Sequence, residues 1–197
     1  MSIAILPMLQ VGGMQLFQME SSDKSEKILP RAFELTMATA LVYLLLIIAC
    51  VLVYVFLGMS VFDAVCHALP TLATGGFSTH DASFGHFTSP ALIWAGTIFM
   101  AFGAMPFVVF IKAMRGEPLD LWRDKQVRAF VVFLVTVSMI LALWLTLTRD
   151  IGFLAALRAA AFNVTSIVTT TGFASEDYTK WGPFAIGVLG SVEPMTA

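Results

Sequence analysis

Charge-free apolar blocks constrain this chain more than any other feature of its sequence. Residues 35–57 carry no charged side chain over 23 positions, and as an α-helix they would measure about 34 Å. A bilayer's hydrocarbon core is about 30 Å thick, so this block is long enough to cross it. Residues 129–148 form a second such block, and residues 91–111 a third, in which Gly103 and Pro106 predict a kink. The sequence therefore predicts an all-α polytopic membrane protein.

The composition agrees with membrane spans and excludes other classes of protein. The chain is 58% hydrophobic and 12% charged, with a mean hydropathy of +0.87, whereas soluble domains are about a quarter charged. A net charge of −2 gives no electrostatic basis for nucleic-acid binding. Cys50 and Cys66 lack C-x-x-C spacing and are expected to act as packing residues. We expect contact with membrane lipid and no nucleic-acid partner.

A short helix followed by polar, glycine-rich sequence lies between the first and third blocks. Residues 60–63, Ser-Val-Phe-Asp, resemble a capping box that opens a helix over residues 61–69, and Pro70 makes this helix difficult to extend. Nine residues measure about 13 Å, roughly half of the bilayer core. A half-length helix followed by an extended loop predicts a re-entrant segment, tolerated at membrane depth only where protein or water satisfies its backbone.

The Thr/Gly-rich loop occurs twice. Residues 69–79 read LPTLATGGFST, and residues 167–175 read IVTTTGFAS after a second short helix predicted over residues 151–165. Span, short helix, loop and span thus occur once in full and a second time cut short, and such an internal repeat constrains the fold strongly. An offset of 96 residues pairs Gly76-Phe77 with Gly172-Phe173, Thr74 with Thr170, Asp81 with Asp177 and His67 with Asn163.

Two such loops suggest an ion filter. A dehydrated monovalent cation needs several oxygen dipoles, which rings of backbone carbonyls supply in potassium filters. Gly75, Gly76 and Gly172 could allow the dihedral angles that turn carbonyls inward, and Thr74, Thr170 and Thr171 could add oxygens. About four loops must converge to surround an ion, and this chain supplies two. One loop alone would be read as an ordinary tight turn, but its duplication in the same setting favours a filter.

The distribution of basic residues predicts the orientation. Eight of the eleven Lys and Arg residues lie in the two linkers between the repeats, at positions 24–31 and 112–128, and none lies in residues 58–90. The positive-inside rule therefore places the linkers in the cytoplasm and both loops on the outer, periplasmic side. The second linker could alternatively dock a cytoplasmic partner.

Other polar residues near the loops have several possible roles. Hydrogen bonds that hold the loops are expected of Thr71, His67 and Asn163, the last being a polar residue in an apolar half-helix. His67, His80, Asp81 and His86 match no familiar zinc spacing. Acidic side chains could attract cations to the mouth or merely cap helices, and Phe77 and Phe173 are read as packing supports behind the filter rather than ion ligands. No nucleophile–base pair suggests an enzyme. The acidic candidates are Asp63, Asp81, Glu176 and Asp177.

Three stretches of the chain resemble the TrkH/KtrB superfamily of potassium uptake proteins, and most of all TrkH: residues 67–80, residues 169–178 and residues 11–17, Val-Gly-Gly-Met-Gln-Leu-Phe. The resemblance implies four helix–pore loop–helix units around one pseudo-fourfold pore in the bacterial inner membrane. It makes Gly76 and Gly172 the filter glycines, typical of K⁺ rather than Na⁺ selectivity. The remaining K⁺ filter positions are Thr74, Gly75, Phe77, Thr170, Thr171 and Phe173. The resemblance also implies a homodimer, a cytoplasmic nucleotide-binding regulator of the TrkA type, and no organic cofactor.

The resemblance divides the chain as follows. Residues 1–19 would end a transmembrane helix of a preceding repeat, 20–34 would be a cytoplasmic linker, and 35–114 a complete repeat with its filter at 71–79. Residues 115–128 would be a second linker, 129–190 an incomplete repeat with its filter at 167–175, and 191–197 an atypical tail in place of the family's Gly/Ser-rich gate. We therefore expect a fragment that holds two of four loops. The alternative to K⁺ uptake is a non-conducting membrane fragment or assembly module that binds partner subunits.

Overall fold

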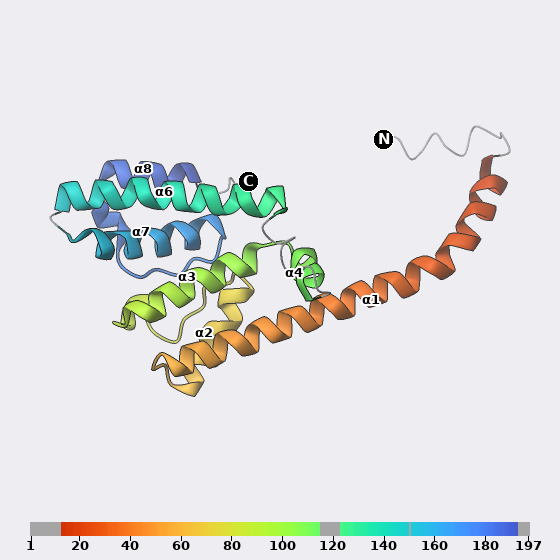
Figure 1. Cartoon of the computed structure of the whole chain (residues 1–197), viewed down its shortest axis with the longest axis horizontal. Coiled ribbons are helices and arrows are strands. Elements are labelled where there is room, and N and C mark those ends of the chain that lie inside the picture. Colours follow the sequence, from red (N-terminus) through yellow and green to blue (C-terminus); the bar gives the residue numbers. More distant parts are fainter. Residues whose placement is uncertain (1–12, 115–122, 150, 193–197) are drawn as a thin grey trace. The chain divides into compact units, whose positions relative to one another are not determined.

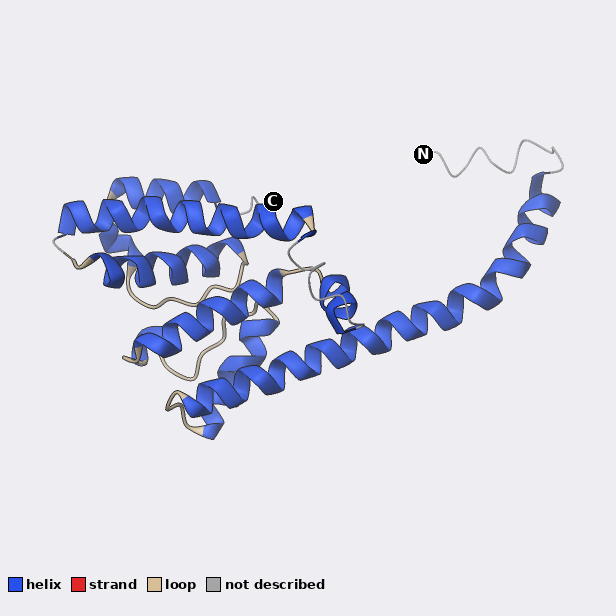
Figure 2. Ribbon diagram, in the orientation of Figure 1, coloured by secondary structure: helices blue, strands red, loops and turns tan. Residues whose placement is uncertain are grey.

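The computed structural model describes residues 13–114, 123–149 and 151–192 of the chain, and these residues contain helices and loops but no strand (Figures 1 and 2). Two helical stretches are long and apolar enough to cross a membrane, Thr36–Phe56 and Lys125–Arg149. Both were expected from the charge-free blocks. The chain divides into two compact units, Met1–Leu41 and Val42–Ala197, and the contacts described below lie within the second.

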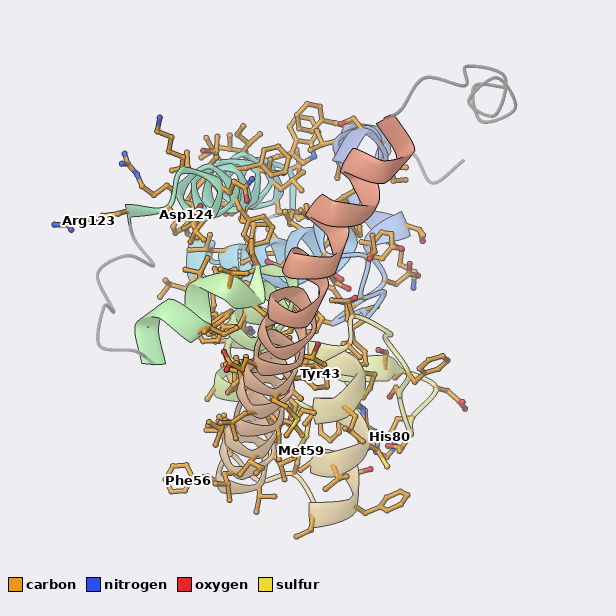
Figure 3. The ribbon with its side chains drawn as sticks, turned by 90° about the vertical axis from the view of Figure 1, so that its right-hand side faces the viewer. Tyr43, Phe56, Met59, His80, Arg123 and Asp124 are labelled. Carbon is orange, nitrogen blue, oxygen red and sulfur yellow. The ribbon has the colours of Figure 1, made fainter. Side chains whose placement is uncertain are left out.

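Helix α1, Gly13–Phe56, passes through residues 20–34 without a break. The sequence predicts a linker here that Pro30 closes, whereas the structure places Pro30 inside the helix. A proline removes one backbone hydrogen bond and tends to kink a helix, but a helix this long can retain the bonds on either side. At the other end of α1, Phe56 points away from the neighbouring helices with 89% of its surface exposed, whereas Met59 is buried (Figure 3).

The half-length helix α2, Val61–Leu72, begins at the expected cap but extends past its expected end. The Ser60 hydroxyl accepts a hydrogen bond from the Asp63 amide at 3.1 Å and donates one to the Asp63 carboxylate at 2.7 Å. The prediction that Pro70 ends this helix is wrong, because the helix runs to Leu72. Pro70 lies close to the C-terminus, where its missing N–H costs a single bond, and the Thr71 hydroxyl donates to the His67 carbonyl at 2.6 Å.

The third apolar block is two helices rather than one kinked span. α3, Pro90–Ala104, ends before Pro106, and α4, Phe107–Met114, begins after it. Met105 has extended backbone with ψ 150°, as expected for a residue that precedes proline. Gly103 serves close packing, because a Cβ there would lie 2.8 Å from the Leu72 carbonyl oxygen at the end of α2.

The second repeat comprises α6, Lys125–Arg149, α7, Phe153–Val168, and α8, Pro183–Val192. α7 ends three residues later than expected. The start of the expected atypical tail, residues 191–192, still belongs to α8, and residues 193–197 lie outside the described part of the chain. Short 3₁₀ helices, Ser83–His86 (η2) and Tyr178–Trp181 (η3), follow the two loops.

Two large apolar clusters, and a small third one of Met105, Val109 and Val127, hold these helices together. The first combines Tyr54 of α1, Phe84 of η2 and Met100 of α3 with Phe162 and Phe173 of the second repeat. The second joins α6, α7 and α8. Cys50 is a buried member of the first cluster and Cys66 is half-buried; both are free thiols. Because aromatic side chains of the second repeat complete the core of the first, the two repeats pack against each other.

Candidate functional site

The two Thr/Gly loops lie against each other at their glycines. A Cβ atom built on Gly76 would lie 2.0 Å from the Thr171 carbonyl oxygen and 3.2 Å from the Gly172 carbonyl carbon. No side chain fits into that space. The structure therefore brings together two segments that are 96 residues apart in the sequence, as convergence of the loops on one site requires.

The backbone conformation repeats together with the sequence. Thr74 and Gly76 have φ angles of +50° and +63°, and their counterparts Thr170 and Gly172 have +57° and +85°. The expectation that Gly75 uses its conformational freedom is not met, since Gly75 is not among the residues with positive φ in the described part of the chain. Threonine rarely adopts this left-handed region, so two aligned threonines there indicate that the surroundings impose the conformation.

Side chains of α1 and α2 hold the first loop from behind. The His67 ring bonds the Asp63 carbonyl through Nδ1 at 2.8 Å and the Ser78 hydroxyl through Nε2 at 2.9 Å. The Thr71 hydroxyl, besides donating to the His67 carbonyl, lies 3.1 Å from the Tyr54 hydroxyl. Both His67 and Thr71 are fully buried. The loop thus rests on buried and part-buried hydrogen bonds from these side chains.

Asp63 ties the outer end of the first loop to the start of α2. Its carboxylate accepts a hydrogen bond from the Thr79 hydroxyl at 2.7 Å, and another from Ser60. These two bonds, from Ser60 and then Thr79, lower the pKa of Asp63 below its usual value, because they stabilise the charged form. His80 Nε2 lies 3.4 Å from the same carboxylate. Asp63 is therefore a structural acceptor as well as a negative charge near the mouth.

The second loop is held by an equivalent set with different side chains. Asn163 Nδ2 donates to the Ser175 hydroxyl at 2.9 Å, and Asn163 Oδ1 accepts from the Ser175 amide at 3.4 Å. The Ser166 hydroxyl donates to the Phe173 carbonyl at 2.6 Å, and the Thr169 and Thr171 hydroxyls lie 2.7 Å apart. Asn163 and His67 occupy aligned positions, so an amide and an imidazole perform the same task in the two repeats.

The two loop phenylalanines differ in their surroundings. Phe173 is 2% exposed and packs on the first repeat, with its ring 4.9 Å from that of Phe84 and stacked at 5.9 Å on His67. Phe77 is 78% exposed. The expected packing role therefore fits Phe173, whereas the described part of the chain leaves most of the Phe77 ring uncovered. A sequence alignment of the repeats could not reveal this difference, because it depends on which neighbour each loop has.

A clamp between the repeats was not foreseen from the sequence. The Gly85 amide donates to the Ala174 carbonyl at 3.1 Å, and the Ser83 hydroxyl accepts from the Ala174 amide at 3.3 Å. A Cβ on Gly85 would lie 2.8 Å from the Ser175 carbonyl oxygen. The outer segment of the first repeat thus fixes the exit of the second loop. The glycine at position 85 within a polar segment was the only hint.

The other polar residues that were expected near the mouth do not form a common site with one another. Asp81 is exposed, whereas Asp177 caps η3 and pairs with Lys180 at 3.1 Å. Hydrogen bonding from the Thr179 hydroxyl, followed by the bond to Lys180, lowers the pKa of Asp177. The His80 and His86 rings stack face to face with centroids 3.7 Å apart. Among the described residues, no three His, Cys, Asp or Glu side chains are grouped as a metal site would require.

Comparison with known proteins gives consistent matches over almost the whole chain. Residues 1–191 match the TrkH family, described as cation transport proteins. The potassium uptake protein TrkI of Halomonas elongata is 45% identical over 94% of this chain and 38% of its own length, and TrkH of Salmonella typhimurium is 39% identical over 96% and 40%. The crystal structure of the potassium transporter TrkH from Vibrio parahaemolyticus superposes with a TM-score of 0.78 at 33% identity, covering 96% of this chain and 38% of that one. The chain thus spans about two fifths of the length of these relatives.

Proposed function

The chain belongs to the TrkH family of cation transport proteins, and on this premise we propose that it contributes two loops of a K⁺ filter to a Trk-type uptake system. The family is one of membrane transporters rather than enzymes. In the proposed role, K⁺ loses its water at the outer mouth, is coordinated by backbone carbonyls of the two loops, and passes to the cytoplasm. K⁺ is then the transported substrate, and no organic cofactor takes part.

The observation that carries this proposal is the paired backbone geometry of the touching loops. In extended backbone, successive carbonyls point to opposite sides. A left-handed residue at every second position, as at Thr74 and Gly76 and again at Thr170 and Gly172, turns alternate peptide planes and can aim consecutive carbonyls the same way. Rings of such carbonyls replace the hydration shell of K⁺. The buried hydrogen bonds behind each loop would keep these dipoles in place while an ion passes.

The finer parts of the proposal follow from the family. We infer a pseudo-fourfold pore, to which this chain brings two of four loops, in the inner membrane of a bacterium. The basic linkers would face the cytoplasm and the loops the periplasm. A homodimer and a TrkA-type nucleotide-binding regulator on the cytoplasmic side are the partners that a Trk system would supply.

Rubidium uptake tests the conducting role directly. The chain would be expressed in bacteria that lack their own K⁺ uptake systems, in parallel with Gly76→Asp and a matched control, Gly152→Asp. Gly152 has open space around a Cβ and caps the N-terminus of α7, where aspartate is a favourable residue. The proposal expects uptake that Gly76→Asp abolishes and Gly152→Asp preserves. Rubidium uptake that is unchanged by Gly76→Asp would refute the proposed filter. No uptake from chain present in the membrane would refute conduction and leave family membership standing.

An assembly module is a second candidate function, and the two loop phenylalanines favour it. Phe77 is 78% exposed where Phe173 is 2% exposed, and Leu69 is 45% exposed where its counterpart Thr165 is 2% exposed. Phe173 and Thr165 of the second repeat are thus buried, but Phe77 and Leu69 at the first loop are not buried in the same way. A module of this kind would bind another helix–loop–helix unit there. Phe77→Ser would then abolish co-purification with such a unit without changing the chain's own folding.

A further inference from the structure

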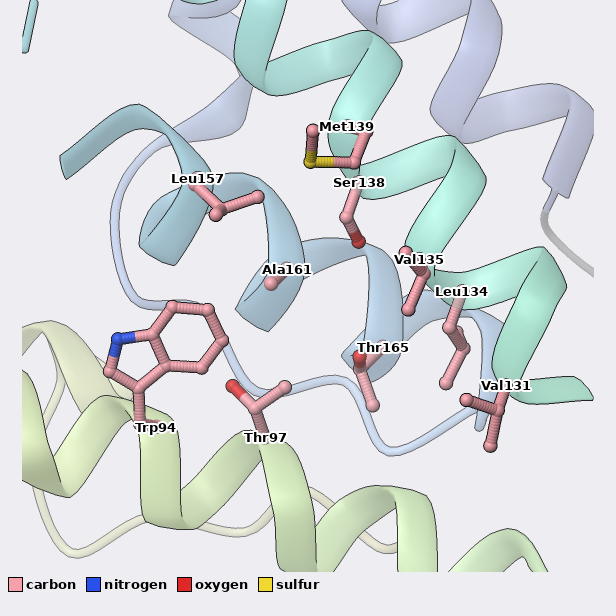
Figure 4. A pocket seen from close by; sticks show the side chains of 10 residues that line it. All are labelled: Trp94, Thr97, Val131, Leu134, Val135, Ser138, Met139, Leu157, Ala161 and Thr165. Carbon is pink, nitrogen blue, oxygen red and sulfur yellow. The ribbon is translucent and has the colours of Figure 1, made fainter. Parts of the chain in front are cut away.

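A cavity of about 260 Å³ lies between α3 of the first repeat and α6 and α7 of the second (Figure 4). Its rim includes Trp94 of α3, Val135 and Met139 of α6, and Leu157 of α7. All of these helices belong to the described part of one chain. The cavity is therefore formed by helices of two consecutive repeats.

The walls of the cavity are apolar apart from three short hydroxyl side chains. Of these, Thr97 already donates to the Ile93 carbonyl at 2.9 Å, and Ser138 and Thr165 are almost completely buried. No charged side chain lines the space. An ionic or strongly polar ligand would find at most these short hydroxyl groups in place of its hydration, so the lining favours an apolar occupant.

The cavity opens onto a surface suited to lipid. Val135 and Met139 at its rim are 55% and 44% exposed, and Ile98 beside it on α3 is 50% exposed. These side chains belong to the apolar exterior of helices that include the candidate span Lys125–Arg149. Around a membrane span, the medium in contact with such a surface is hydrocarbon. The cavity is therefore continuous with the lipid-facing side of the protein.

The dimensions of the cavity match part of a lipid chain. On α6 it extends from Val131 to Met139, and eight residues of helix correspond to about 12 Å. One leaflet's hydrocarbon is about 15 Å deep, half of the bilayer core. The cavity follows the helix axes, the direction in which lipid chains lie. An empty apolar void would forfeit dispersion contacts on all its walls.

We propose that this groove, lined by Trp94, Val135, Met139, Leu157 and Ala161, is a binding site for one acyl chain of a membrane phospholipid. Ala161 forms its floor and is 7% exposed. Its small side chain leaves the space that the acyl chain fills. The site does not depend on conduction by the loops.

Photo-crosslinking would test the site. The full chain would be reconstituted in phosphatidylcholine vesicles whose lipid carries a diazirine in the middle of one acyl chain, and labelled residues would be mapped by mass spectrometry. Val135 lines the groove, while Val132, one turn away on the same helix and 64% exposed, does not. Met139 and Ile140 form a second pair, at 44% and 49% exposure. The proposal expects severalfold more labelling of Val135 than of Val132, and of Met139 than of Ile140.

Filling the groove supplies the decisive control. Ala161→Phe, or Ser138→Leu should the first variant fold poorly, should reduce labelling of Val135 and Met139 severalfold and leave Val132 and Ile140 unchanged. Labelling that follows exposure alone, and that both filled variants leave unchanged, would show only the annular lipid that surrounds any membrane protein and would overturn the proposal. Crosslinks from groove residues to another protein chain would overturn it as well.

Discussion

At the scale of single residues, the two loop glycines, Gly76 and Gly172, share a backbone conformation but differ in their surroundings. Both have positive φ, which disfavours any side chain. Only Gly76, however, faces backbone so closely that a Cβ would overlap the Thr171 carbonyl; a Cβ built on Gly172 would meet no atom within 4 Å. The sequence alignment of the repeats pairs these two glycines, but their surroundings in the structure differ.

Alanine at the two glycines should separate conformational strain from steric overlap. Gly172→Ala should lower the free energy of unfolding by about 1–2 kcal/mol, the cost of a left-handed backbone at a residue with a Cβ. Gly76→Ala adds a clash with backbone and should lower it further, by roughly 1–3 kcal/mol more. Thermal unfolding of the purified variants in detergent would measure both. Equal losses would show that the close approach of the loops is relieved at little cost.

The Asp63 carboxylate should give the first loop a pH dependence in the acid range. Its pKa is lowered in the folded chain by hydrogen bonds from Ser60 and Thr79. Its stabilising contribution is therefore complete above the unfolded value, about 3.9, and is lost as the pH falls through the lower folded value. Asp63→Asn should melt below the parent chain at pH 7, and the two curves should converge in acid. A difference that persists unchanged to pH 3 would contradict this assignment.

At the scale of helices, the accuracy of the predicted helix ends depended on the position of each proline. Pro106 lies inside an apolar block and separates α3 from α4, whereas Pro70 lies two residues before the end of α2 and does not interrupt that helix. A local sequence pattern gives the helix propensity at both positions. It does not show whether the surroundings tolerate the loss of the backbone hydrogen bond that each proline removes. The two long spans, the capping box and the duplicated loops were predictable, since they depend on composition and short spacing.

Close contact between α2 and α3 depends on Gly103. Gly103→Ala would bring a Cβ to 2.8 Å from the Leu72 carbonyl oxygen, and we expect a loss of about 1–3 kcal/mol as α3 is displaced. Gly190→Ala in α8 is the matched control, because nothing lies within 4 Å of its Cβ. There, alanine should be neutral or stabilise by up to about 1 kcal/mol. Comparable melting temperatures for the two variants would argue against close packing at Gly103.

At the scale of the whole molecule, the repeats are similar in sequence but not equivalent in place. Phe173 of the second loop packs against aromatic side chains of the first repeat, whereas Phe77 of the first loop is left largely uncovered by the described part of the chain. This asymmetry explains why the role of Phe77 could not be predicted. The clamp at Gly85 escaped prediction for a similar reason, because it arises from contacts between segments about 90 residues apart.

Replacing each loop phenylalanine separately by alanine should reveal the difference in burial between Phe173 and Phe77. Phe173→Ala removes a ring that is 2% exposed and packed on His67 and Phe84, and should cost about 3–5 kcal/mol. Phe77→Ala removes a ring that is 78% exposed and should change the stability of the isolated chain by less than about 0.5 kcal/mol. Differential scanning calorimetry of both variants would test this. A large loss for Phe77→Ala would mean that the ring is covered in the purified chain.

The clamp that joins Ser83 and Gly85 to Ala174 also bears on biogenesis. A ribosome delivers the first loop and its outer segment to the membrane before it makes the second. The partners that fix the exit of the second loop are therefore already present when that loop emerges. The earlier repeat would thus guide the folding of the later one. Misfolding of residues 83–85 would also disturb the second loop, which is made after them.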